Sequence, residues 1–374
     1  MKDKLSHRER VELALDHKEP DRLPLDLGGT AGLLFDGLYF RLKKHLKIEN
    51  KVQPFRFGHT ANYYDEDILD CLDIDIRRIL PLRKKKDYTV KDNTFVDEWG
   101  VLNKFEGDFV NYVDHPLKEP SMEVLNRHPW PEPEEMFSFS DLREYSKYLF
   151  EKTDFALSLR SPFSGGFLDR ACYLRGTENF FMDLYLNPDF AEGLLHKIFD
   201  IYYKTYDLLL SEVGQYLSIV ENNDDYGTQE SLLISPEMFK KYLKPLHMRL
   251  NKLIREKAPK AKTFLHSDGA VRELIDDFID SGVEILNPIQ ASARDMDTKR
   301  LKEEFGDRIC FHGGIEQKPL SGSKEQVYEE LMLRFHTLGK DGGYIMAPVN
   351  HIGSDVPLEN VIYLYETARQ KCIY

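Results

Sequence analysis

Short apolar segments alternate with helix-period segments along most of this chain, and that alternation restricts its fold more than any other feature. Each apolar segment has the length of a strand and ends in polar residues or glycine. The predicted strands cover residues 23–28, 73–79, 156–161, 217–222, 263–268, 284–289, 309–314 and 344–349. The predicted amphipathic helices cover residues 6–17, 179–186, 188–212, 236–257, 271–281, 297–305, 324–338 and 358–370. The eight strand–helix units predict an α/β fold, a closed (β/α)8 TIM barrel, with a doubly wound open sheet as the alternative.

Two positions near the start of this pattern carry their own signals. Ser6 is followed by Glu9, which is the capping-box spacing that begins a helix. Pro24 lies inside the first predicted strand and cannot donate a hydrogen bond to a ladder, which weakens that strand. The first helix is therefore better marked than the first strand.

Residues 81–150 interrupt the alternation. They are rich in Lys, Asp, Pro and aromatic residues, and residues 94–102 have a hairpin-like pattern. We predict an insertion after the second strand, a small β hairpin with loops, that covers the barrel mouth within a single domain of residues 1–374. The basic run at residues 83–86 is either a solvated edge or a contact for an acidic partner or a substrate carboxylate.

Composition and charge restrict the partners and the compartment. The formal net charge of -13 argues against a footprint on nucleic acid. No apolar run is long enough to span a membrane and the N-terminus has no signal-peptide apolar region, so we predict a cytoplasmic protein without a membrane contact. The four cysteines have no Cys-x-x-Cys spacing, which predicts packed free thiols rather than disulfides or a Cys-rich zinc site. The absence of a P-loop and of a Gly-x-Gly-x-x-Gly fingerprint argues against nucleoside triphosphates and dinucleotides.

Polar residues gather at the carboxyl ends of the predicted strands, where a barrel places its active site. The fifth strand ends in His266 and Asp268, which share one face because strand side chains alternate. His266 could be a hydrogen-bonded core histidine, but beside a carboxylate at a strand end we interpret it as a metal ligand or an acid/base group. The fourth strand runs into the acidic segment 221–229, which is either a helix-leading loop with N-cap duties or a functional turn. In the functional interpretation, Asp225 and Gln229 hydrogen-bond substrate or a metal-bound group.

Three further strand ends supply polar candidates, namely Asn287 and Gln290, His312 and Glu316, and Asn350 and His351. We predict that the catalytic residues are His266, Asp268 and Asp225. We predict substrate contacts from Gln229, Asn287, Gln290, His312 and Asn350.

A divalent metal would suit part of this set. The expected ligands are His266, Asp268 and His351, with a carboxylate from Asp225 or Glu316. Zinc is favoured, and the spacing leaves iron and manganese open. An acid/base site without a metal is consistent with the same residues.

A series of short motifs follows a fixed order along the chain. They are Asp-Asp-Tyr-Gly-Thr-Gln at 224–229, Ser-Pro-Glu-Met-Phe at 235–239, Lys-Pro at 244–245, His-Ser-Asp-Gly at 266–269, Leu-Asn-Pro-Ile-Gln at 286–290, Gly-Gly-Ile-Glu-Gln at 313–317, Gly-Gly-Tyr-Ile-Met-Ala-Pro at 342–348 and Val-Pro-Leu-Glu-Asn-Val at 356–361. Together they resemble the uroporphyrinogen decarboxylase superfamily, and residues 8–10 and 20–24 are similar to the start of its methyltransferase-like members. The resemblance covers nearly the whole chain, is weakest across residues 81–150, and implies a β/α barrel and a homodimer.

The chain departs from the decarboxylases of that superfamily where carboxylates would bind. The resemblance implies an Arg-Gln-Ala-Gly-Arg-Tyr segment that grips the acidic side chains of a tetrapyrrole, but residues 26–32 contain no arginine. Asn350 replaces the histidine expected near the last strand, with His351 beside it. Because a site without those cations should bind an octacarboxylate poorly, decarboxylation of a porphyrinogen is disfavoured.

The corrinoid-dependent methyltransferases of the superfamily imply a zinc site of His-x-Cys on the fifth strand and Cys on the last. His266 matches, but Asp268 and Asn350 replace the cysteines, which argues against thiol activation and favours harder ligands. The resemblance therefore implies an O-demethylase-like methyltransferase, which moves a methyl group from a small methoxylated aromatic compound to the Co(I) corrinoid of a partner protein. The alternatives are a decarboxylase of uroporphyrinogen or another carboxylated substrate, and a non-catalytic binding barrel.

Overall fold

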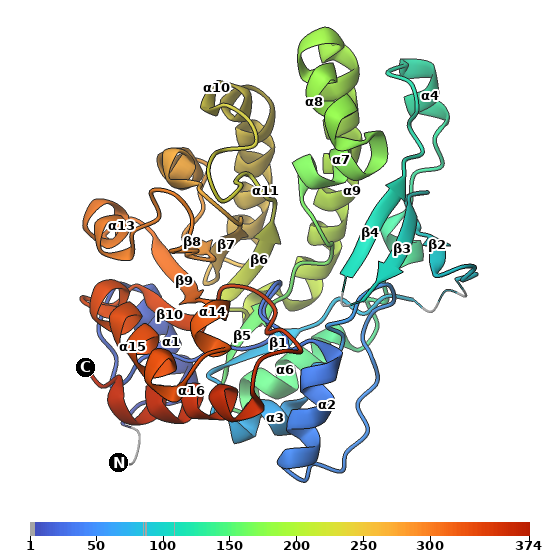
Figure 1. Ribbon diagram of the computed structural model, residues 1–374. Coiled ribbons are helices and arrows are strands. Elements are labelled where there is room, and N and C mark those ends of the chain that lie inside the picture. The colour runs from blue at the N-terminus through green and yellow to red at the C-terminus, as the bar shows by residue number, and fades with distance from the viewer. Residues whose placement is uncertain (1–3, 85, 87, 108) are drawn as a thin grey trace.

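The computed structural model describes residues 4–84, 86, 88–107 and 109–374 of the chain. Its centre is a seven-stranded parallel sheet whose strands follow one another in chain order, as Figure 1 shows. They are β1 (Ile76–Ile79), β5 (Ala156–Leu159), β6 (Ile219–Asn223), β7 (Lys262–His266), β8 (Ile285–Asn287), β9 (Cys310–Ile315) and β10 (Tyr344–Pro348). A doubly wound sheet reverses its strand order in the middle, and this sheet does not. The predicted α/β barrel is confirmed.

Residues 23–27 fill the gap between β10 and β1. The N–H of Met346 donates to the carbonyl of Pro24 (2.9 Å), and on the other side the N–H of Asp75 donates to the carbonyl of Leu25 (2.9 Å). Pro24 has no N–H, and the N–H of Leu25 donates to the Asp75 carboxylate (2.7 Å) instead of to a neighbouring backbone. The prediction of a regular first strand is therefore wrong, although this segment occupies the expected position in the barrel.

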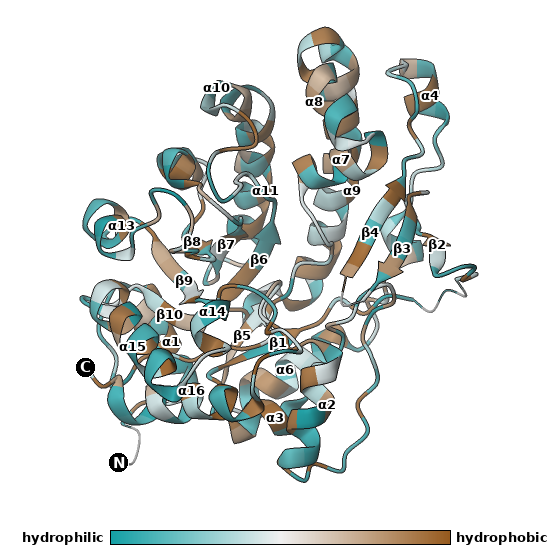
Figure 2. Cartoon of the chain, viewed as in Figure 1, coloured by the Kyte–Doolittle hydropathy of each residue, from teal (hydrophilic) through white to brown (hydrophobic). Residues whose placement is uncertain are grey.

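Helices cover the outside of the barrel. Those between or beside the barrel strands are α1 (His7–Leu15), α2 (Asp36–His45), α3 (Glu66–Cys71), α6 (Leu142–Lys152), α7 (Phe167–Arg175), α8 (Thr177–Leu186), α9 (Pro188–Val213), α10 (Pro236–Met238), α11 (Lys244–Lys257), α12 (Ile275–Asp280), α13 (Thr298–Phe305), α14 (Gln317–Leu320), α15 (Lys324–Arg334) and α16 (Leu358–Lys371). Figure 2 shows hydrophilic and hydrophobic residues alternating along outer helices such as α15 and α16. This is the pattern of a helix that packs one side against a core and exposes the other.

Two helix starts show how local sequence sets the boundaries. The capping box at α1 is confirmed, because the side chain of Ser6 accepts from the N–H of Glu9 and the Glu9 carboxylate accepts from the N–H of Ser6 (2.9 Å). The helix predicted at 236–257 is less regular than expected. It begins as α10, passes through a π-helical turn at Phe239–Leu243, and continues as α11.

The amino-terminal end of the barrel interior is closed by apolar packing. One residue from each sheet strand meets two residues of α1 in a buried cluster made of Val11, Leu15, Ile76, Ala156, Ile219, Phe264, Ile285, Cys310 and Ile345. Because this end is plugged, an opening into the barrel is left to the carboxyl ends of the strands.

Residues 81–150 lie between β1 and β5 and carry a small antiparallel sheet of β2 (Thr94–Val96), β3 (Leu102–Glu106) and β4 (Phe109–Asp114). The pairing of β2 with β3 confirms the hairpin pattern at 94–102, and β4 adds a strand that the sequence interpretation missed. The short helices α4 (Met122–Arg127) and α5 (Pro133–Met136) follow. Within the predicted basic run 83–86, Lys85 lies outside the described residues. Among the helices of the described residues, none has both the length and the apolar content needed to cross a membrane.

Candidate active site

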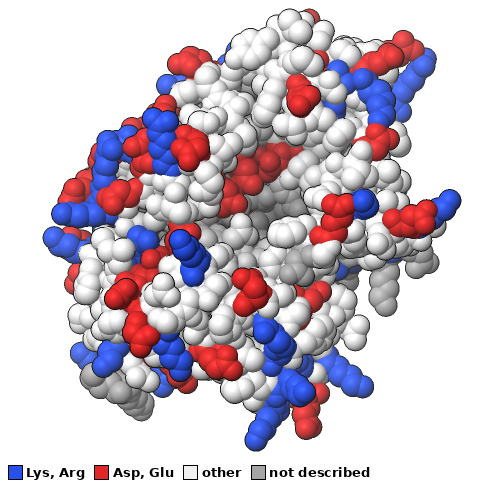
Figure 3. Space-filling view, viewed as in Figure 1, with Lys and Arg blue, Asp and Glu red and all other residues white. Residues whose placement is uncertain are grey.

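Three titratable side chains meet at the carboxyl ends of β6 and β7, and we call Asp225, His266 and Asp268 the acid cluster. Nε2 of His266 lies 3.8 Å from Oδ1 of Asp225 and 3.8 Å from Oδ2 of Asp268. The pairing of β6 with β7 sets Asn223 opposite His266, so the turns after the two strands meet. There the N–H of Asp268 donates to Oδ1 of Asp225 (2.9 Å). The structure thus brings together the three residues predicted to be catalytic, and Figure 3 shows acidic side chains inside a hollow in the middle of the molecule.

Asn287 fixes the ring of His266. Its Oδ1 accepts a hydrogen bond from Nδ1 of His266 (2.7 Å), and its Nδ2 donates to Nδ1 of His312 (2.8 Å). Because an amide oxygen only accepts, the hydrogen of a neutral His266 stays on Nδ1 and Nε2 presents a lone pair to the carboxylates. Asn287 and His312, predicted to bind substrate, are both buried behind His266 and hold it in place.

A chain of buried charges anchors His312 in turn. Nε2 of His312 donates to Oδ2 of Asp26 (2.7 Å). Arg78 binds both carboxylate oxygens of Asp26, and its Nε donates to Oε1 of Glu221 (2.8 Å). Asp26, Arg78 and Glu221 are at most 1% exposed, so their charges are compensated within the barrel rather than by solvent. The charge of Arg78 is therefore balanced by Asp26 and Glu221 within this network.

The surroundings of the acid cluster raise the pKa values of Asp268 and His266. Burial raises the pKa of Asp268 to about 6, with His266 opposing and Asp225 reinforcing the change. Burial alone would lower the pKa of His266, but the carboxylates of Asp268 and Asp225 outweigh it, so the pKa is raised. Both shifts favour the protonated form, and the pKa of Asp268, at about 6, lies near the pH at which acid/base catalysts work best.

Two further acids, the buried Asp224 and the partly buried Asp169, lie behind Asp225, and the sequence interpretation assigned neither to the site. Asp224 accepts from the N–H groups of Phe167 (2.9 Å) and Leu168 (3.0 Å) at the start of α7, yet burial raises its pKa to about 7. Asp169 accepts from the N–H of Asp225 (3.2 Å), and burial with the charges of Asp225 and Asp224 raises its pKa well above the usual range. Concentrated negative charge of this kind favours retained protons or a bound cation.

The acid cluster fits a divalent cation. Its imidazole and two carboxylates each offer a ligand atom within 4.8 Å of the others. Nitrogen and oxygen donors of this kind suit zinc, and also manganese or iron. The hydrogen bond from Nδ1 of His266 to Asn287 is the outer contact that orients many metal-bound imidazoles.

The other two predicted metal ligands lie outside the acid cluster. Nδ1 of His351 accepts from the N–H of Leu33 (3.0 Å). Oε1 of Glu316 accepts from the N–H of Ser292 (2.9 Å). The structure therefore does not assemble the ligand set that the sequence suggested, although the charge of Glu316 helps to raise the pKa of Asp268.

The remaining predicted substrate contacts lie at different distances from the acid cluster. Nδ2 of Asn350 donates to Oδ2 of Asp268 (3.2 Å), so Asn350 touches the cluster directly. Oε1 of Gln290 accepts from the N–H of Gly269 (3.0 Å) and shapes the loop after β7. Gln229 is exposed, and the structure does not bring it into the cluster.

A cavity of about 300 Å³ opens beside the acid cluster, and Asn350 and His351 lie in its wall. Strands of the insertion contribute Phe95, Phe109 and Tyr112, so the insertion shares this cavity with barrel loops. Other aromatic residues of the wall are Phe35, Phe55, Phe57, Trp99 and Phe163. A concave site with aromatic walls and a few polar groups suits a flat ring.

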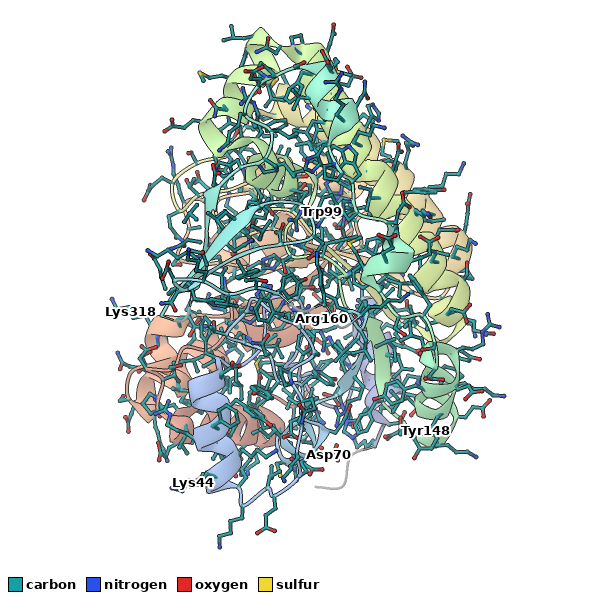
Figure 4. The ribbon with its side chains drawn as sticks, turned by 90° about the vertical axis from the view of Figure 1, so that its right-hand side faces the viewer. Lys44, Asp70, Trp99, Tyr148, Arg160 and Lys318 are labelled. Carbon is teal, nitrogen blue, oxygen red and sulfur yellow. The ribbon has the colours of Figure 1, made fainter. Side chains whose placement is uncertain are left out.

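The same cavity is lined by four arginines, Arg56, Arg83, Arg160 and Arg170. They come from separate segments, so no motif links them in the sequence. We expected a site without arginine cations because residues 26–32 contain no arginine, and this expectation is wrong. Figure 4 shows Arg160 and Trp99 in the interior of the molecule, far from surface side chains such as Lys44 and Lys318.

Comparisons with known proteins agree with this architecture. The family described as Uroporphyrinogen decarboxylase (URO-D) matches residues 131–371. No curated protein sequence matches the chain. A solved structure of a methyltransferase from Methanosarcina mazei is similar at a TM-score of 0.64 and 17% sequence identity, covering 98% of this chain and 99% of that chain. A putative vitamin-B12 independent methionine synthase from Listeria monocytogenes gives a TM-score of 0.43 at 10% identity, covering 93% of this chain and 98% of that chain, which is too low to carry an argument.

The likeness to the Methanosarcina mazei protein shows a shared fold along nearly the full length of both chains. The family match covers most of the barrel, from just before α5 to the end of α16. This chain belongs to the uroporphyrinogen decarboxylase family.

Proposed function

We propose that this protein is a methyltransferase that moves a methyl group from a small methoxylated aromatic compound to the Co(I) corrinoid of a separate protein. The observation that carries the proposal is the acid cluster beside the aromatic cavity, because it sets proton-handling groups next to a site for a flat ring. Membership of the uroporphyrinogen decarboxylase family and the fold shared with a methyltransferase support it.

Demethylation of an aryl ether breaks the methyl–oxygen bond and leaves its electron pair on the oxygen. The methyl group goes to Co(I), which supplies the pair for the new bond, and the departing oxygen needs a proton. His266 and Asp268 can supply it, because their raised pKa values keep a proton on the pair near neutral pH. Asn287 keeps His266 aimed at the reacting end, and the aromatic walls hold the ring.

As the alternative to proton donation by His266 and Asp268, we propose that Asp225, His266 and Asp268 hold zinc. When bound, zinc would supply Lewis-acid stabilisation of the departing oxygen. The chain would orient its ligands through Asn287 on the His266 side and Asn350 on the Asp268 side. Elemental analysis of the purified protein tests this: about one zinc per chain is expected, and much less in Asp268→Asn. A wild-type protein free of zinc would leave the acid/base version of the mechanism.

The methyl transfer itself is tested by incubating the purified chain with a reduced corrinoid protein and a panel of methoxylated aromatics. We expect the visible spectrum of the corrinoid protein to change to that of its methylated form, with one phenol formed per methyl group transferred. Omission of the chain is the control for direct reaction. No transfer across a broad panel would end the proposal.

A second candidate, a decarboxylase of a carboxylated substrate, is favoured by one observation. Arg56 and Arg160 line the same cavity and could bind a carboxylate. A cavity of about 300 Å³ lies at the small end for ligand sites, which favours a small acid over a tetrapyrrole. Release of CO₂ in the absence of any corrinoid protein would identify this activity.

A further inference from the structure

Among the described residues, two of the arginines in the cavity wall form no ion pair with an acidic side chain. Arg160 is 5% exposed, and its Nη2 donates to the carbonyl of Thr30 (2.7 Å) while its buried Nε has no hydrogen-bond partner. Arg56 is similar, because its Nη2 donates to the carbonyl of Ala61 (2.9 Å) and its Nε is buried and unpaired. Polar groups that are both buried and unpaired are rare, and at a cavity wall they indicate an unfilled ligand site.

The other two arginines are neutralised. Arg83 forms an ion pair with Glu98, and Arg170 lies 4.0 Å from Asp97. The excess positive charge of the cavity therefore comes from Arg56 and Arg160, which we call the arginine pair.

Both members of the arginine pair lie against one aromatic ring. Their guanidinium carbons are 5.1 Å (Arg56) and 5.2 Å (Arg160) from the centroid of the same ring, that of Phe55. Burial lowers the pKa of both guanidinium groups, for Arg160 to about 10, and each of His59 and His351 has its pKa lowered by burial and then by the two arginines. Two like charges held this way cost free energy until an anion joins them.

The cavity of the arginine pair borders the acid cluster through Asn350. Asn350 and His351 lie in the wall of the cavity that the arginines line, and Asn350 also donates to Asp268. A ligand with its anionic group at the arginines can therefore extend its other end toward Asp268 and His266. The cavity volume of about 300 Å³ suits a ligand with a single ring between these ends.

We propose that Arg56 and Arg160 bind a carboxylate of the methyl donor, so that the substrate class is a small methoxylated aromatic acid. This inference rests on the proposed function for the role of the methoxy group. A carboxylate is planar and offers two oxygens, which match the forked donors of guanidinium groups. The aromatic walls then hold the ring while the methoxy group faces the acid cluster.

The test is a binding measurement that needs no methyl transfer. Isothermal titration calorimetry on the full chain compares 3-methoxybenzoate with 3-methoxybenzyl alcohol, a neutral probe of nearly the same shape. Arg160→Gln and Arg56→Gln are the test variants, and Arg143→Gln, at an exposed arginine of α6 paired with Glu212, is the control. We expect each test variant to lose at least about 30-fold in affinity for the acid and less than about twofold for the alcohol. The control should match the wild type.

Thermal unfolding separates a binding role from a structural role. Because the buried Arg160 forms no ion pair in the free protein and its Nε is unpaired, Arg160→Gln should unfold at the same temperature as the wild type or higher. Adding 3-methoxybenzoate should raise the midpoint of the wild type only. A lower midpoint without ligand, combined with unchanged affinity for the acid, would assign Arg160 a structural role and overturn the inference. Arg56→Gln repeats the test if Arg160→Gln does not fold.

The outcomes distinguish this inference from the proposed function. Acid-selective binding that both arginine variants lose supports the carboxylate subsite even if no methyl group reaches a corrinoid protein, in which case only the proposed function fails. Equal affinity for the acid and the alcohol overturns the subsite even if methyl transfer is observed. Tighter binding of 3-methoxybenzenesulfonate than of 3-methoxybenzoate would overturn the assignment of a carboxylate.

Discussion

The arginine pair lines the cavity and the acid cluster lies beside it, joined through Asn350, but the two are built in different ways. The cluster comes from the ends of two neighbouring strands, β6 and β7, whose register fixes the distance between Asp225 and His266. The arginine pair comes from the loop around Arg56 and the end of β5 at Arg160, which meet only when loops pack over the barrel. A site whose geometry is set by strand register can be predicted from the sequence. A binding site that is assembled from loops cannot. We therefore expect catalysis and ligand selection to separate under mutation.

The largest expected effect is on catalysis at the acid cluster. His266→Ala should lower kcat/KM for methyl transfer about 10²- to 10⁴-fold, because it removes a proton donor or metal ligand. It should leave the affinity for 3-methoxybenzoate nearly unchanged, since the arginine pair remains. His196→Ala, at an exposed histidine of α9, is the matched control and should keep full activity. A loss of less than about tenfold in kcat/KM for His266→Ala would show that the acid cluster does not take part in catalysis.

The next effect concerns the orientation of His266. Asn287→Ala should lower kcat/KM about 10- to 100-fold, as the loss of an outer contact to a metal-bound or catalytic imidazole does. It should also lower the free energy of unfolding by about 1–3 kcal/mol, because it leaves buried nitrogens of His266 and His312 without a partner. Steady-state kinetics and urea denaturation measure the two effects. Asn179→Ala, at an exposed asparagine of α8, is the control and should change neither kcat/KM nor the free energy of unfolding. If Asn287→Ala behaves like this control, Asn287 does not orient His266.

A smaller effect should appear in the pH dependence of stability. The pKa of Asp268 is about 6 in the folded state and 3.8 without the fold, so the folded state holds this proton more tightly. The contribution of Asp268 to stability is then fully present below pH 3.8 and is lost as the pH rises through about 6. Asp268→Asn cannot ionise, so between pH 4 and 7 the free energy of unfolding of this variant should rise by roughly 2–3 kcal/mol relative to that of the wild type.

Urea denaturation across that pH range measures the difference between the two proteins. Asp307→Asn, at a side chain 84% exposed, is the control and should differ from the wild type by the same amount at every pH. If the free energy of unfolding of Asp268→Asn falls relative to that of the wild type as the pH rises, the folded state stabilises the ionised carboxyl of Asp268. The prediction of a raised pKa would then be wrong.

The smallest effect tests the contact between the two regions. Asn350→Leu removes the hydrogen bond from Nδ2 of Asn350 to the ionised Asp268 (3.2 Å), which should raise the pKa of Asp268 further. Because Asp268 acts as a proton donor, the alkaline limb of the pH–rate profile should move upward by less than about one pH unit, with little change in the affinity for 3-methoxybenzoate. A large loss of affinity with an unmoved limb would place Asn350 in ligand binding rather than beside the catalytic acid.

The fold and the acid cluster were largely predictable because both depend on local periodicity. Alternation of strand and helix segments predicts the barrel, and the His-x-Asp spacing predicts that His266, the last residue of β7, and Asp268, two residues beyond it, lie near each other. Pro24 shows the limit of this approach. Its segment occupies a barrel position through side-chain and carbonyl contacts that a strand pattern does not describe.

The predicted ligands His351 and Glu316 fail for a related reason. Each follows a barrel strand and carries a suitable side chain, but each accepts a hydrogen bond from a backbone N–H outside the acid cluster. Position at a strand end is visible in the sequence, whereas the direction of a loop side chain depends on which neighbouring group binds it. Asn287 shows the reverse case, because it was predicted to bind substrate and instead lies between two histidines.

The sequence by itself determined the order of the barrel strands and the residue types at their carboxyl ends. Side-chain periodicity is a local property, so it can be read without knowing what the chain packs against. Only the tertiary structure decided which cations reach the cavity, because Arg56 and Arg160 are brought to one aromatic ring by the packing of loops that are distant in the sequence. It also decided the aim of His266, which follows from one amide side chain on the neighbouring strand.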